Sequence, residues 1–168
     1  MTREKFTALK YVLELERVAL ERLIALADAE NGALVANDRG ALVGAVHEQE
    51  RHLASMAELE RSRALSAVAL AQALSLPESS SLAALCDALP GDLAVVGRRL
   101  HDDLRDLASR LSQINRENDA LVRQALHYTQ HSVSLLTRIA QQEAGRDTYA
   151  PPGHGRRRGG AAVLDRRA

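Results

Sequence analysis

An unbroken apolar repeat runs through forty residues of this chain and limits what the chain can fold into. It alternates steps of four and three residues over eleven intervals. Its members, which we call the first stripe, are Leu100, Leu104, Leu107, Leu111, Ile114, Asn118, Leu121, Ala125, Tyr128, Ser132, Leu135 and Ile139. A mean period of 3.5 residues is typical of a long α-helix that packs against other helices in a left-handed arrangement.

The composition extends this prediction to the whole chain. Hydrophobic residues make up 46% of the sequence but aromatic residues only 2%. A sheet-based fold would need more β-branched and aromatic residues, whereas long helices pack through aliphatic side chains. We therefore predict an all-α fold.

Two periodic segments precede the first stripe, one over about residues 3–35 and one ending near Leu74. Between them, Asn37 and Asp38 are expected to end one helix and cap the next. The second segment has one apolar register, made of Leu42, Val46, Leu53, Met56, Ala67, Leu70 and Leu74. The same register places Gln49, Glu60 and Arg63 on the seam, so we expect this helix to be imperfectly buried.

Loop signals divide the rest of the chain. A loop over 76–81 leads to a short predicted helix, Leu82 to Ala88, with Ser81 as N-cap, and Pro90 to Asp92 open the last long helix. After Gly145 the chain is rich in Gly, Pro and Arg, which predicts disorder. The expected architecture is an elongated antiparallel bundle of three long helices plus one short helix over 1–145, with a disordered tail over 146–168.

Charge and cysteine content restrict the environment of the protein. The formal net charge is zero, which does not favour a nucleic-acid partner, although residues 145–168 carry a net charge of +4. Cys86 is the single cysteine, so no disulfide can form within the chain. The sequence has no apolar run of transmembrane length, and its first residues are too charged for a signal peptide. These features predict a soluble cytoplasmic protein.

The chemically reactive residues do not form a catalytic motif. His47 and His52 are five residues apart, which rotates them about 140° on a helix and keeps them from sharing a metal ion. Two pairs do have the four-residue spacing of metal ligands, namely Glu48 with His52 and His127 with His131. We expect these side chains to be solvated, with a metal-binding bundle as an alternative, and we expect neither a cofactor nor an enzyme. Cys86 is interpreted as a small core residue.

The last predicted helix changes character along its length. From about Asn118 onward, a second set of positions with steps of four and three lies beside the first stripe. This second stripe consists of Val122, Leu126, Thr129, Val133 and Leu136. The surplus apolar face could pack against the first helix, a second copy of the chain or a helix of another protein. We favour a helix of another protein, because a predicted disordered tail follows directly and leaves the end of the bundle open.

Two asparagines mark this change. Asn118 occupies a first-stripe position, where a buried polar side chain would fix the register of the helices. Asn115 lies beside it and is expected to be more available to a partner.

Three features follow one another along the chain, namely the Ala36–Asp38 turn, the charged stretch with Glu48, Glu50, Arg61 and Arg63, and the Ser81–Pro90 insert. Together with the features of the last helix, they give residues 1–150 a resemblance to the FlgN family of bacterial flagellar type III export chaperones. Its most specific part is the N-x-x-N-x-x-L pattern of Asn115, Asn118 and Leu121, followed by Tyr149 and Gly153.

This resemblance implies a cytoplasmic chaperone without enzyme activity. Its clients would be the C-terminal amphipathic helices of the hook–filament junction proteins FlgK and FlgL, delivered to the flagellar export gate. The implied client-binding residues are Asn115, Asn118, Leu121, Val122, Leu126, Val133 and Leu136, and Tyr149 would contact the export gate by its position. A structural coiled-coil or scaffold protein, in which the second stripe forms a homodimer, is the alternative hypothesis.

Overall fold

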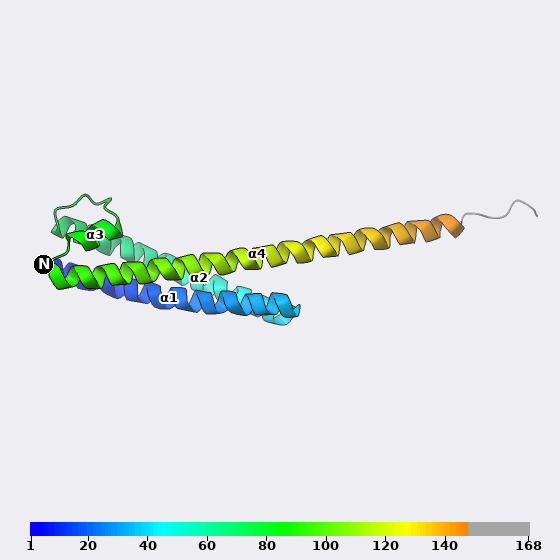
Figure 1. Ribbon diagram of the computed structural model, residues 1–168, viewed down its shortest axis with the longest axis horizontal. Helices are drawn as coiled ribbons and strands as arrows, with labels where there is room; N and C mark the ends of the chain where they lie inside the picture. Colours follow the sequence, from blue (N-terminus) through cyan, green and yellow to red (C-terminus); the bar gives the residue numbers. More distant parts are fainter. Residues whose placement is uncertain (148–168) are drawn as a thin grey trace, which may run out of the picture. The chain divides into compact units, whose positions relative to one another are not determined.

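The part of the chain that the structure describes contains four helices joined by short turns and loops. In this computed structural model, residues 1–147 are described, with side chains described for 1–142. The helices are α1 (Thr2–Ala36), α2 (Arg39–Ala73), α3 (Leu82–Ala88) and α4 (Gly91–Asp147), and no strand occurs among these residues (Figure 1). The all-α prediction of three long helices and one short one is confirmed, while the predicted tail lies outside the described part except for its first residues.

The turn between α1 and α2 forms as the sequence predicts. Asn37 adopts the left-handed conformation with φ of 53° and ψ of 35°. The Asp38 backbone N–H donates to the Ala33 carbonyl at 2.9 Å, which closes the C-terminus of α1 as a Schellman motif does. The Oδ1 of Asp38 then accepts from the Ala41 backbone N–H at 3.0 Å and caps α2. A connection this short makes α1 and α2 antiparallel neighbours.

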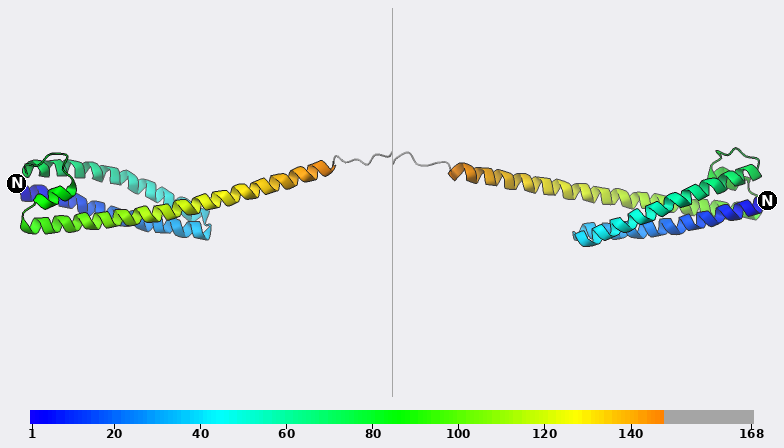
Figure 2. Two further views of the ribbon diagram at one scale, coloured as in Figure 1. Left: turned by 45° about the horizontal axis from the view of Figure 1, so that its top comes forward. Right: turned by 180° about the vertical axis from the view of Figure 1, so that it is seen from behind.

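Polar contacts between helices establish how they pair. Arg63 of α2 donates to Glu16 of α1 at 3.0 Å, and Gln49 donates to Glu30 at 2.9 Å, as an antiparallel pair requires. In contrast, α4 runs parallel to α1, because Asp92 meets Arg3 near their starts and Arg110 meets Asp28 farther along. Figures 1 and 2 show α1 beside both α2 and the first part of α4.

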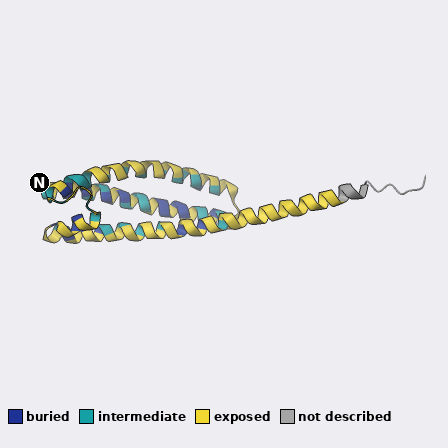
Figure 3. Ribbon diagram, turned by 90° about the horizontal axis from the view of Figure 1, so that it is seen from above, coloured by how far each residue is buried: buried dark blue, intermediate teal, exposed yellow. Residues whose placement is uncertain are grey.

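The main core lies at the end of the bundle that holds α3. All four helices contribute to it, and Leu9 and Leu13 of α1, Leu70 of α2 and Leu85 of α3 are fully buried there. A smaller cluster joins Ile24 and Ala27 of α1 to Ile114 of α4. Buried residues concentrate on α1, as Figure 3 shows. The first helix is therefore the one around which the others pack.

The middle of α2 is more open than its register suggests. Leu53 occupies a predicted seam position, yet it is 57% exposed, so that part of the prediction is wrong. Nearby, Gln49 and Arg63 of α2 bond to α1, and Leu59 of α2 is half-buried. Burial raises the pKa of the Glu16 carboxyl, and the Arg63 guanidinium opposes that shift.

The short helix packs closely on α4 because α4 has a glycine at the contact. An ideal Cβ placed on Gly97 would lie 2.9 Å from the Cys86 Sγ and 3.4 Å from the Leu89 Cδ1. Both neighbours are buried. A side chain at position 97 would therefore push α3 away from α4.

We predict that Gly97→Ala destabilises the protein, because overpacking of this kind costs about 1–3 kcal/mol. In a Cys86→Ala background the nearest contact is removed, and alanine's better helix propensity of about 1 kcal/mol should then make Gly97→Ala neutral or stabilising. Chemical denaturation of the parent, the two single variants and the double variant measures the effect of Gly97→Ala on the free energy of unfolding in each background. Equal destabilisation in both backgrounds would contradict the close contact with the Cys86 sulfur.

Candidate functional site

The buried asparagine of the first stripe joins α4 to α1. Asn118 is 3% exposed, as its register predicts, and both ends of its amide are bonded. Its Nδ2 donates to the Ala27 carbonyl at 2.9 Å, and its Oδ1 accepts from the Asn31 Nδ2 at 2.7 Å. We call this arrangement the asparagine clasp. Sequence reasoning missed Asn31, because nothing near this residue in the sequence indicates a partner on the last helix.

The clasp lies close to the end of α1. Asn31 is followed by only five more residues of that helix, which ends at Ala36. Because α1 and α4 run parallel, α1 can accompany α4 for little more than one further turn beyond Asn118. Leu121 is half-buried, and the next positions on α4 lose their cover.

The second stripe is exposed in the structure. Within the unit Met1–Leu126, Val122 is 44% exposed and Leu126 is 56% exposed. The second unit begins at His127, and there Val133 and Leu136 are exposed as well. Large exposed apolar side chains at helical spacing are a feature of surfaces that bind another helix.

The last part of the first stripe differs from its prediction. Tyr128, Leu135 and Ile139 continue the core register in the sequence, but the structure leaves all three exposed. Periodicity identifies the apolar face of a helix. Burial of that face also requires another helix that extends alongside the same residues. The exposed apolar surface of α4 is therefore broader than the second stripe alone.

The remaining predicted site residues have separate positions. Asn115 is exposed and lines a recess beside α4, in keeping with its expected availability. Tyr149 lies outside the described residues. The structure thus brings Asn115, Asn118, Leu121, Val122 and Leu126 onto adjoining turns of α4, while Val133 and Leu136 follow in the second unit.

The candidate metal ligands and the cysteine have other surroundings in the described part of the chain. No group of three or more His, Cys, Asp and Glu side chains is placed to hold a metal ion among the described residues. Glu48 pairs with Arg51, and the His127 ring contacts Tyr128 edge to face. Cys86 is buried, and burial raises the pKa of its thiol, which does not suit a nucleophile.

A family comparison agrees with this arrangement. The model of the family described as FlgN protein matches residues 1–156. The chain belongs to the FlgN family. The match covers all four helices, and the family is one of flagellar export chaperones. Comparison with curated proteins and with solved structures found no match. No helix in the described residues of this FlgN-family chain is long and apolar enough to cross a membrane.

The clasp makes a testable contribution to stability. We predict that Asn118→Ala destabilises the protein by about 1–3 kcal/mol, because it leaves the partly buried Asn31 amide without its acceptor. Asn115→Ala makes the same change at an exposed position three residues earlier and should stay within about 0.5 kcal/mol of the parent. Urea denaturation compares the two variants. Equal effects would show that the clasp does not hold α4 on α1.

Proposed function

We propose that this protein is a cytoplasmic flagellar export chaperone for the hook–filament junction proteins FlgK and FlgL. It would cover the C-terminal amphipathic helices of these clients, prevent their premature association and deliver them to the export gate. The observation that carries the proposal is the exposure of Val122 and Leu126, followed by Val133 and Leu136 at the same helical spacing.

The energetics of this surface suit a chaperone. Covering exposed apolar area contributes about 25 cal/mol for each Å² removed from water. A contact of roughly 800 Å² on each partner supports micromolar to nanomolar affinity. Ordering a flexible client segment offsets part of the gain, so the client can be released at the export gate.

The stripe is tested by introducing charge. We predict that the double variant Val122→Asp and Leu126→Asp loses binding to a synthetic peptide of the FlgK C-terminal helix. Both positions are exposed in the free protein, so helicity should be largely retained. Isothermal titration calorimetry measures the affinity, and circular dichroism measures the helicity.

A matched control places the same charges elsewhere on α4. Ala120→Asp with Gln124→Asp has the same four-residue spacing at exposed positions, on the side of α4 away from the clasp. It should bind the FlgK peptide as the parent does. Unchanged affinity in the Val122 and Leu126 variant would place the client site elsewhere.

The same exposed stripe would also serve a scaffold protein that self-associates. Light scattering with and without the FlgK peptide separates the two functions. A chaperone forms a complex whose mass rises by that of the peptide. A tight homodimer that ignores the peptide would favour the scaffold and remove the chaperone proposal for this surface.

Delivery is tested separately from binding. We propose that Tyr149 contacts the export gate, and we predict that Tyr149→Ala keeps affinity for the FlgK peptide but lowers secretion of FlgK. The readouts are calorimetry on the purified variant and the amount of FlgK in the culture medium. Normal secretion by the variant would remove Tyr149 from the docking step.

A further inference from the structure

A groove runs beside α4 within the unit Met1–Leu126. One part has a volume of about 430 Å³ and lies between Leu20 of α1 and the turns of α4 from Ala108 to Asp119. An adjoining part of about 320 Å³ is lined by Glu30 of α1, Gln49 of α2 and the turns of α4 from Asn115 to Val122. Asn115 and Asp119 line both parts, so we treat them as one side groove.

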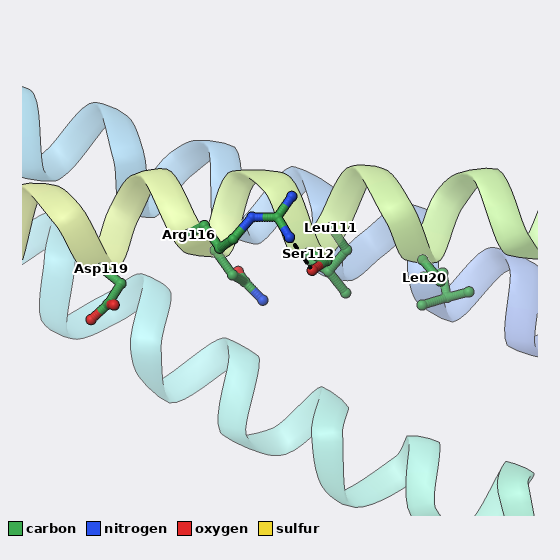
Figure 4. A pocket seen from close by; sticks show the side chains of 7 residues that line it. Leu20, Leu111, Ser112, Arg116 and Asp119 are labelled. Atoms are coloured by element: carbon green, nitrogen blue, oxygen red, sulfur yellow. Dashed lines mark hydrogen bonds between the residues drawn. The ribbon is translucent and has the colours of Figure 1, made fainter.

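The first part of the side groove has an apolar floor and a polar rim, whereas the second part is lined mainly by polar side chains. Figure 4 shows Leu20 and Leu111 along the groove, with Arg116 and Asp119 at its edge. Leu20 and Leu111 are half-buried, although both belong to the apolar faces of their helices. Both side chains therefore remain partly open to solvent along the groove. A groove of this character fits an amphipathic helix laid along α4.

The side groove continues into the surface proposed for the client. Along α4, the groove positions Ala108, Ser112, Asn115 and Asp119 are spaced by four, three and four residues. Steps of three and four then lead to Val122 and Leu126, the two exposed members of the second stripe in this unit. All six positions lie on one face of the helix.

The charges in the groove indicate which partner helix it fits. The half-buried Glu30 carboxylate accepts a hydrogen bond from Gln49 at 2.9 Å, and this amide brings no positive charge. Asp119 pairs with Arg123 at 2.6 Å. A basic side chain opposite Glu30 would therefore gain a charge-assisted bond. At the other end, the small side chains of Ala108 and Ser112 leave room for larger apolar residues.

We propose that the side groove binds a further part of the same client helix that covers Val122 and Leu126. This part of the client is amphipathic, with large apolar residues opposite Ala108 and Ser112 and a lysine or arginine opposite Glu30. The inference rests on the proposed function, because it takes the export client as the occupant. It adds a second contact region, and the two together span about 27 Å from Ala108 to Leu126 at 1.5 Å per residue.

The experiment fills the groove without touching the buried core. In the full chain, Ala108→Arg places a long side chain at an exposed groove position, and Ser109→Arg makes the same change on the side of α4 away from the bundle. Leu136→Asp serves as a variant of the second stripe. Affinity for the FlgK C-terminal peptide is measured by calorimetry, mass by light scattering and folding by circular dichroism.

The expected result is a loss of about tenfold or more in affinity for Ala108→Arg, with Ser109→Arg unchanged and both variants fully folded. Unchanged affinity for Ala108→Arg together with a loss for Leu136→Asp would overturn the groove and leave the proposed function standing. A parent protein that does not bind the peptide would overturn both. A third outcome is that the parent is a dimer, Ala108→Arg is a monomer, and the affinity for the peptide is unchanged. That result would assign the groove to a second copy of the chain and overturn the inference.

Discussion

The amide of Asn118 fixes the position of α4 along α1, and the rest of the proposed binding surface depends on that position. Leucine seams alone tolerate a slip by a heptad, because every step presents similar side chains. An amide that donates to the Ala27 carbonyl and accepts from Asn31 is satisfied in a single register. That register sets Asn118 five residues before the level at which α1 ends, so Leu126 falls where cover is lost. Val122 lies just before that level and is exposed because it belongs to the second stripe.

A second consequence follows from the polar bridges between α1 and α2. Gln49 and Arg63 span the distance to α1 with long side chains, and both bonds satisfy carboxylates that are buried or half-buried. Replacing either residue by leucine would leave a carboxylate of α1 without this donor. The polar residues that interrupt the α2 register are therefore partners of α1, and Gln49 also lines the side groove beside α4.

The sequence predicts most of the fold because the ends of helices are set by contacts between residues that are close in the sequence. Asn37, Asp38 and Ser81 end or cap helices through bonds to backbone groups within a few residues, so their types and order suffice to place them. Burial is different, because it depends on which helix lies opposite and how far that helix extends. Leu53, Tyr128 and Leu135 keep the core spacing and are nevertheless exposed. Asn31 was missed for the same reason, since nothing local to it reveals its partner on α4.

The exposure of so much apolar surface raises the question of how the free chaperone stays dispersed. Charged and polar side chains lie beside the apolar stripes on α4, including Arg123 and Gln130, while Gln124 and Arg138 lie on the opposite side. The apolar side chains stand in rows, or ridges, that a helix with matching spacing can cover more fully than a flat or irregular surface can. A client helix with matching spacing buries all the ridges together, whereas an unmatched chain buries one or two and leaves polar groups without water. Selectivity for amphipathic helices can therefore arise from spacing, and affinity from the length of helix that is covered.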